Sequence, residues 1–183
     1  MKLKNALILF CLSTIPVSAF SINFPSGLSW KIMPEVTFNY PNTTGTKEQR
    51  ETVKTIWRNK LKASDTAFSL LANASTQENN YYFSMLNSET SGCMAAPNGD
   101  GENLEPDAYS TCAMRVVQQN KVSKKVKVQD LQNYCYLNLN DEPGELAKNH
   151  TEFAYDSKSK TIYFRTIMYG KHAPACDRAI RLK

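Results

Sequence analysis

Residues 152–170, EFAYDSKSKTIYFRTIMYG, carry the clearest fold signal in the sequence. Two runs rich in aromatic and β-branched residues, EFAYD and TIYFRTIMYG, flank the short polar sequence SKSK. Such residues favour strands, and a short polar connection between two of these runs is typical of a β-hairpin. The segment therefore predicts two antiparallel strands near the C-terminus.

The sequence before this hairpin predicts further strands. Residues 81–86 (YYFSML) are aromatic and apolar, residues 112–119 (CAMRVVQQ) are rich in strand formers, and residues 134–140 (YCYLNLN) alternate. In residues 121–129 (KVSKKVKVQ), valines and lysines alternate over much of the length, which predicts a strand with one lysine face. A short edge strand is expected at residues 36–40.

The clearest helix signal lies closer to the N-terminus. Thr46-Lys-Glu-Gln49 has the form of a capping box, and Val53, Ile56 and Trp57 follow at helical spacing. We expect a second helical stretch, or a continuation of the same helix, at residues 66–74 (TAFSLLANA). Helix followed by a run of strands predicts an α+β fold. Its N-terminal helical region would pack on a mostly antiparallel sheet of about five or six strands, held by two disulfides.

The first 19 residues are expected to be a signal peptide. Lys2 and Lys4 precede a short apolar run that ends at the small-residue site Val-Ser-Ala19, and the run is too short to cross a bilayer. Cleavage would leave residues 20–183 as one exported domain without a membrane anchor, and it would lower the formal net charge from +5 to +3. Such a mild positive charge does not favour a nucleic-acid partner.

The number of cysteines also indicates an exported protein. Cleavage would remove Cys11 and leave an even number of cysteines, which in an exported chain predicts two disulfides. We favour Cys93–Cys112 and Cys135–Cys176, because pairing neighbours closes the loop that otherwise has least to hold it. Zinc is the competing use of four cysteines, but no pair has the short spacing of a zinc site, so we expect no metal there.

The loop between Cys93 and Cys112 resembles a calcium loop only in part. Asn98, Asp100 and Glu102 have the spacing of calcium ligands, but Asn103 and Tyr109 stand where such a loop needs Gly and Glu. We therefore expect a solvated loop that needs no metal. Its acids are candidates for contact with a basic partner: Asp100, Glu102, Glu105 and Asp107.

His150 and His172 are the only histidines of the chain, and each lies near a lysine. Two histidines and a lysine could cleave a phosphodiester by acid–base catalysis if they met in one cleft. The sequence holds no nucleophile motif, no Gly-rich phosphate loop and no free cysteine once two disulfides form. We therefore predict no catalytic residues and no cofactor, and keep a secreted hydrolase or toxin, such as a nuclease, as the alternative.

The lysines of residues 121–129 can be interpreted in two ways. Lys121, Lys125 and Lys127 could form a docking patch for an acidic partner, or they could simply discourage strand-to-strand aggregation at a solvent-exposed edge. Three glycosylation sequons, at Asn42, Asn73 and Asn149, would matter only in a eukaryotic secretory pathway.

Together these features predict a non-enzymatic exported protein, periplasmic or secreted, that binds another protein. Inhibitors and immunity proteins are the type of protein expected, because catalytic motifs are absent while a closed acidic loop, a lysine-rich strand and many tyrosines offer recognition surface. A surface or appendage component is a further alternative, which strand edges able to accept a donated strand would favour.

Overall fold

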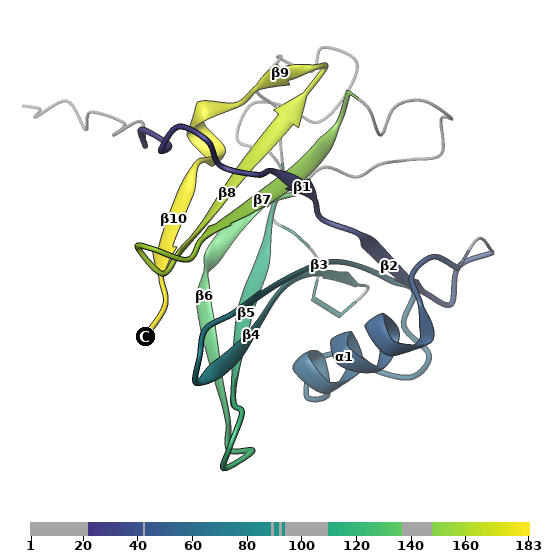
Figure 1. Ribbon diagram of the computed structural model, residues 1–183. Helices are drawn as coiled ribbons and strands as arrows, with labels where there is room; N and C mark the ends of the chain where they lie inside the picture. Colours follow the sequence, from purple (N-terminus) through teal and green to yellow (C-terminus); the bar gives the residue numbers. More distant parts are fainter. Residues whose placement is uncertain (1–21, 42, 89, 92, 94–109, 137–147) are drawn as a thin grey trace, which may run out of the picture.

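The computed structural model describes residues 22–41, 43–88, 90–91, 93, 110–136 and 148–183, and this part of the chain is mostly β-structure (Figure 1). The strands form two antiparallel sheets. The meander sheet pairs its strands in chain order: β2 (Glu35–Phe38), β3 (Ala67–Ser75), β4 (Asn79–Ser88), β5 (Ser110–Asn120) and β6 (Val126–Tyr136). The C-terminal sheet has the spatial order β1 (Lys31–Ile32), β7 (His150–Asp156), β8 (Thr161–Met168) and β10 (Arg178–Arg181), with β9 (Lys171–His172) also paired to β8.

The only α-helix of the described residues, α1 (Lys47–Trp57), lies between β2 and β3 in the chain. Its predicted capping box is confirmed: the Gln49 backbone N–H donates to Thr46 Oγ1 at 3.2 Å, and the Thr46 N–H donates to Gln49 Oε1 at 2.7 Å. Val53, Ile56 and Trp57 are buried, as their helical spacing predicts. A short 3₁₀ helix, η2 (Pro174–Cys176), precedes β10.

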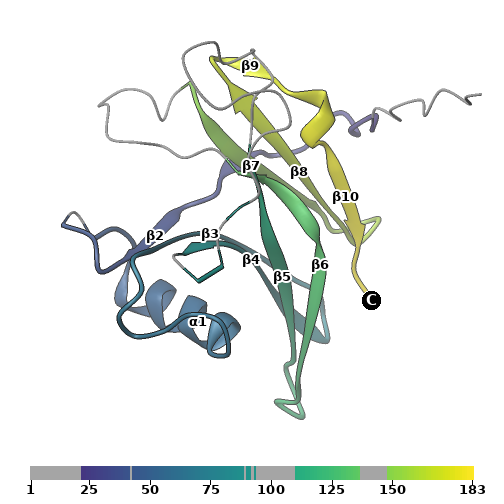
Figure 2. The same cartoon turned by 180° about the vertical axis from the view of Figure 1, so that it is seen from behind.

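The elements form three layers, with the meander sheet in the middle (Figures 1 and 2). One apolar core lies between α1 and this sheet, where Trp57 and Leu71 are buried. A larger core lies between the two sheets, where Phe83 of β4 and Phe164 of β8 meet edge-on with ring centroids 5.4 Å apart. β3, β4 and β5 are therefore covered on both faces, whereas most of β6 is exposed.

The segment from β1 to β2 connects the two sheets directly. The backbone N–H of Met33 donates to Thr151 of β7 at 2.8 Å, and the next residue, Pro34, accepts from the N–H of Leu71 in β3 at 3.1 Å. Two adjacent residues thus bond to different sheets, and this holds the two sheets together where the chain passes from β1 to β2 (Figure 1).

The expected N-terminal helical region packed on one sheet is wrong, because the described residues form one α-helix and two sheets. Residues 66–74, expected to be helical, belong almost entirely to β3. The physical reason is burial on both faces: Leu71 packs toward α1, whereas Leu70 and Ala72 pack between the sheets. A strand covered on both faces is apolar throughout and loses the alternation that distinguishes a strand from a helix.

The strand predicted at residues 121–129 begins later, because residues 121–125 form the connection after β5. β6 then runs without a break from Val126 to Tyr136 and so includes the start of the strand predicted at residues 134–140, of which residues 137–140 lie outside the described part of the chain. The hairpin predicted at residues 152–170 is confirmed as β7 and β8, and the predicted edge strand is confirmed as β2.

Two disulfides are present, Cys93–Cys112 and Cys135–Cys176, and they are the pairs favoured from the sequence. The second joins β6 of the meander sheet to η2, which leads directly into β10 of the C-terminal sheet. It is therefore a covalent link between the two sheets. Beside it, Arg178 of β10 donates to the backbone carbonyls of Gln132 and Asn133, both at 2.7 Å. Two disulfides are typical of an oxidising, exported compartment.

Candidate functional site

Both histidines lie on the outer face of the C-terminal sheet. Ile167 of β8 is paired on one side with His150 of β7 and on the other with His172 of β9. Directly opposed residues point to the same face, so the two imidazoles share that face with one strand between them. Because neighbouring strands lie about 4.8 Å apart, the two backbones are separated by roughly 10 Å.

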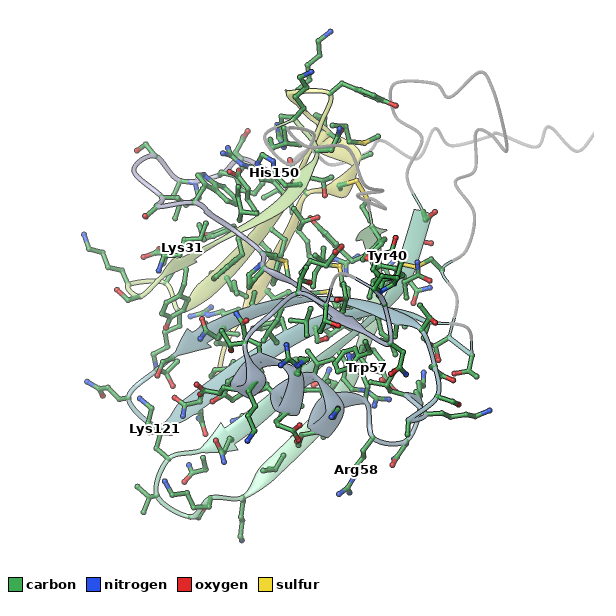
Figure 3. The ribbon with its side chains drawn as sticks, turned by 90° about the vertical axis from the view of Figure 1, so that its right-hand side faces the viewer. Lys31, Tyr40, Trp57, Arg58, Lys121 and His150 are labelled. Atoms are coloured by element: carbon green, nitrogen blue, oxygen red, sulfur yellow. A yellow bond between two sulfur atoms is a disulfide. The ribbon has the colours of Figure 1, made fainter. Side chains whose placement is uncertain are left out.

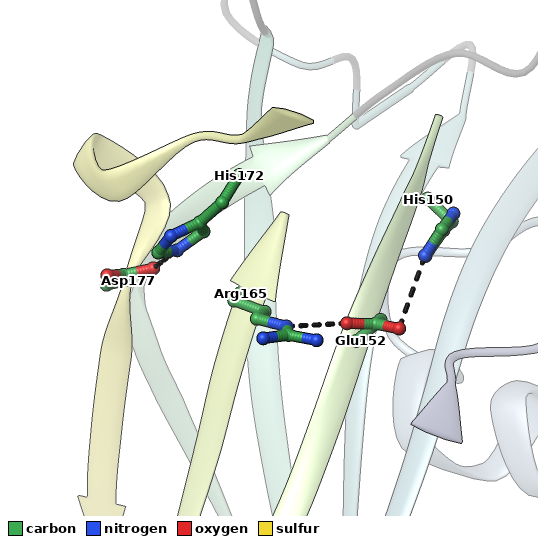
Figure 4. Close-up of polar contacts among 5 residues, drawn as sticks. All are labelled: His150, Glu152, Arg165, His172 and Asp177. Carbon is green, nitrogen blue, oxygen red and sulfur yellow. Dashed lines mark hydrogen bonds and ion pairs between the residues drawn. The ribbon is translucent and has the colours of Figure 1, made fainter. Parts of the chain in front are cut away.

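Each histidine has its own carboxylate (Figure 4). His150 Nε2 lies 3.3 Å from Glu152 Oε1, and the other oxygen of Glu152 accepts from Arg165 Nε at 2.5 Å. His172 Nε2 lies 2.6 Å from Asp177 Oδ1. Burial raises the pKa of the Asp177 carboxyl, and the hydrogen bond and the charge of His172 act in the opposite direction.

The N-terminal segment covers part of this polar layer. Arg165 Cζ lies 4.1 Å from the centre of the Trp30 ring, a cation–π contact. Phe24 packs against Trp30, with ring centroids 4.9 Å apart, and lies 5.9 Å from the His172 ring. The two histidines thus contact different carboxylates on the same face of the sheet.

The lysines singled out from the sequence lie at the far end of the molecule, where Figure 3 shows Lys121 well away from His150. Lys121 Nζ donates to the Thr76 carbonyl at 2.6 Å, and its backbone N–H donates to the Glu78 carbonyl at 2.8 Å. Lys121 therefore joins the β3–β4 turn to the β5–β6 connection. Lys125 and Lys127 are exposed.

The β5–β6 hairpin also presents an apolar surface and a strand edge. Val122, Val126 and Val128 are 90%, 55% and 49% exposed. β6 is the last strand of the meander sheet, and no strand of the described residues pairs with its outer edge. Arg178 occupies that edge only at Gln132 and Asn133. No strand of the described residues covers the rest of this edge, whose backbone groups can pair with a further strand.

Arg115, a buried residue of β5, connects β6 to the end of α1. Its Nε donates to Asp130 Oδ1 of β6 at 2.7 Å, and its Nη1 donates to the Ile56 carbonyl at 2.9 Å. Its Cζ also lies 4.6 Å from the Trp57 ring centre. One buried guanidinium thus connects the exposed strand to the end of α1. The hydrogen bond from Arg115 is the main reason why the pKa of Asp130 lies below its ordinary value.

We expect Asp130→Asn to lower the free energy of unfolding by about 0.5–1 kcal/mol at neutral pH, because the Asp130 side chain is largely exposed. A carboxyl whose pKa is lowered by folding contributes its full stability above its unfolded pKa, and loses it as pH falls through the folded pKa. Urea unfolding from about pH 6 to pH 2 should therefore show the difference between wild type and variant shrinking below about pH 4. A difference that stays constant over this range would contradict the ion pair.

The remaining residues predicted for a site fall in two groups. Asp100, Glu102, Glu105 and Asp107 lie outside the described residues, as does the sequon residue Asn42, so their roles stay predictions. The sequon residue Asn73 is exposed in β3, whereas Asn149 Oδ1 accepts from the backbone N–H of Tyr169 at 2.8 Å.

Sequence reasoning missed a basic groove beside α1. A cavity of about 560 Å³ is lined by one face of the helix, by residues of and after β2, and by the segment after the helix. Its lining includes Arg50, Lys54, Arg58 and Lys62 and no acidic residue. These four cations are spaced four residues apart in the sequence, and this spacing could have indicated that they share one face. The opposite wall comes from a distant segment that no local pattern identifies.

The described residues hold no group of three or more His, Cys, Asp or Glu side chains that could bind a metal ion. Nor do they include a helix long and apolar enough to cross a membrane. Comparison with known proteins gives no match: no family model fits the chain, and no curated protein or solved structure matches it.

Proposed function

We propose that this chain is a non-enzymatic exported protein, periplasmic or secreted, that binds another protein in the manner of an inhibitor or immunity protein. The β5–β6 hairpin is its contact surface in this proposal. The observation that carries it is the clustering of exposed apolar side chains. Of the five large hydrophobic residues exposed in the described chain, three lie within residues 122–128.

Exposed apolar side chains gathered at one place favour a binding surface, since a group of them costs free energy in water until a partner covers it. Lys124, Lys125 and Lys127 are exposed in the same hairpin. Because side chains alternate along β6, Lys127 points to the face opposite Val126 and Val128. A partner that binds around the hairpin would therefore meet apolar side chains on one face and positive charge on the other, which acidic residues of the partner would complement. The outer edge of β6 adds backbone groups that an extended segment of the partner could pair with.

The structure beneath the hairpin favours the same use. Lys121 anchors the hairpin to the β3–β4 turn, and the Arg115–Asp130 pair anchors β6 to the α1 layer. A surface held in place before binding loses less conformational entropy when the partner arrives. The nuclease alternative would need His150 and His172 to act together across the intervening strand β8, and each instead contacts a carboxylate of its own.

The proposal is tested by placing a photo-crosslinking amino acid at Val122 or at Val128 and exposing the protein to the fluid of its native compartment. We expect both positions to give an adduct with the same partner. Lys158, in the exposed β7–β8 turn, is the matched control position and should give none. In the same experiment, Lys125→Glu with Lys127→Glu should lower the adduct yield about tenfold, because two attractive charges become repulsive.

An inhibitor or immunity role adds a second readout. The captured protein should lose activity when the purified wild-type chain is added, and should keep it when the doubly reversed lysine variant is added. An equal adduct from Lys158, or no adduct from either valine, would refute the hairpin as the contact surface. A captured partner whose activity does not change would leave a binding protein but contradict the inhibitor type.

A further inference from the structure

We infer that the basic groove beside α1 is a second binding site, which takes an extended acidic peptide segment with carboxylates at every second residue. This inference does not depend on the role of the β5–β6 hairpin, because the two surfaces share no residue. The groove has the volume of an ordinary ligand site, at about 560 Å³.

The charge of the groove defines the ligand class. The lining holds four cations and no carboxylate, so positive charge predominates for an anion that enters the groove, with Glu51 and Asp65 close by outside the lining. Arg50 is held in place, since its Nη1 donates to the Gly45 carbonyl at 2.5 Å. Lys54 lies 3.2 Å from Glu51, which is not in the lining.

The side chains of the other two cations, Arg58 and Lys62, are available to bind a ligand. Within the described residues, no side-chain hydrogen bond or ion pair holds Arg58 or Lys62, and both are exposed. Figure 3 shows Arg58 at the surface beside the end of α1. The backbone N–H of Lys62 donates to Asp65 Oδ2 at 3.1 Å, which is the main cause of the lowered pKa of that carboxyl, and the charge of the Lys62 side chain is a minor cause. These two side chains can therefore turn to a ligand without losing an internal partner.

The spacing of the helix cations matches an extended chain. Arg50, Lys54 and Arg58 follow one another at steps of four, and each step advances about 6 Å along the helix axis. In an extended peptide, every second side chain points the same way, and these are about 6.6 Å apart. A segment of the form Glu-x-Glu-x-Glu lying along α1 can therefore set one carboxylate opposite each of the three cations.

The rest of the groove suits a peptide better than a polyanion. Phe38 and Leu61 give the lining an apolar part, against which the carbon chains of glutamate can pack. Glu48 and Glu51 lie on the same helix outside the lining. A nucleic acid or sulfated glycan, charged at every repeat, would bring like charges beside them, whereas a short peptide confined to the groove would not.

The test uses two fluorescein-labelled peptides of equal composition and charge, Glu-Ser-Glu-Ser-Glu-Ser-Glu and Glu-Glu-Glu-Glu-Ser-Ser-Ser. Fluorescence anisotropy at low salt measures their binding to the full chain. We expect the alternating peptide to bind more tightly than the clustered one. Arg58→Glu with Lys62→Glu should weaken its binding about tenfold. Lys125→Glu with Lys127→Glu, which changes the net charge equally, should change it less than about twofold.

Each contrary result overturns a defined part of the inference. Equal losses in the two variants would mean that net charge alone attracts the peptide and that the groove is no site. Equal binding of the two peptides would refute the match of spacing. If a sulfated heparin oligosaccharide binds more tightly than the peptide and loses affinity in the Arg58 and Lys62 variant, the groove is a polyanion site instead. Loss confined to the Lys125 and Lys127 variant would move acidic-peptide binding to the hairpin.

Discussion

Replacing Cys135 and Cys176 together by alanine is expected to lower the free energy of unfolding by about 4 kcal/mol. The bridge closes a loop with a sequence separation of 41, and opening it returns that conformational freedom to the unfolded chain. Both cysteines are buried in the core between the sheets, so their removal also takes away packed atoms. The bridge joins β6 to η2, and its loss removes a covalent link between the two sheets.

The measurement is guanidinium unfolding followed by circular dichroism, with Cys93→Ala and Cys112→Ala as the comparison. That bridge has a sequence separation of 19, for which chain entropy gives about 3 kcal/mol. Reductant should lower the melting temperature of the wild type and leave a variant that lacks both bridges unchanged. An unfolding midpoint that does not move in the Cys135 and Cys176 variant would contradict a stabilising bridge between the sheets.

The elements that the sequence predicts correctly are those with local signals. The capping box from Thr46 to Gln49 determines the start of α1 through contacts within one helical turn. The polar turn before Thr161 determines the β7–β8 hairpin in the same way: Asp156 accepts from the backbone N–H of Lys158 at 2.9 Å and from the Ser159 hydroxyl at 2.6 Å. Both signals lie within a few residues of the structure they specify.

The errors arise where distant segments decide the outcome. β3 is a strand because β2 and β4 bond to its edges and both of its faces are covered, and residues 66–74 by themselves carry no trace of this. The second sheet was missed for a related reason. β1 and β9 are two residues long each, so their pairing with β7 and β8 depends on neighbours far along the chain.

The candidate sites divide in the same way. The valines and lysines of residues 121–129 are evident in the sequence, but only the pairing of β5 with β6 shows which of them stand at a turn and which on an open edge. The pairing of His150 and His172 with separate carboxylates depends on a three-strand register. Spacing in the sequence could suggest that the two histidines share a site, and only the fold could show which carboxylate each of them contacts.

Trp57→Ala is expected to lower the free energy of unfolding by about 4 kcal/mol, because it removes a large, fully buried side chain from the core between α1 and the meander sheet. The Trp57 indole also has two directed contacts. Its Nε1–H donates to Ser84 Oγ of β4 at 2.7 Å, and its ring lies under the guanidinium of Arg115. Its loss therefore weakens the helix, the sheet and the anchor of β6 together.

Trp57→Phe separates packing from hydrogen bonding. Phenylalanine keeps an aromatic ring in the core and beneath Arg115 but has no N–H donor for Ser84. Because Ser84 Oγ still shares a hydrogen bond with Ser69 Oγ at 2.7 Å, the lost donor should add only about 1 kcal/mol to the cost of the smaller ring.

Lys54→Ala, on the exposed side of the same helix, should change stability by less than about 0.5 kcal/mol. In urea unfolding, we expect Trp57→Ala to be the least stable variant, Trp57→Phe to be more stable, and Lys54→Ala to be the most stable. If Trp57→Ala were no less stable than Lys54→Ala, α1 would not be packed on the meander sheet through this residue.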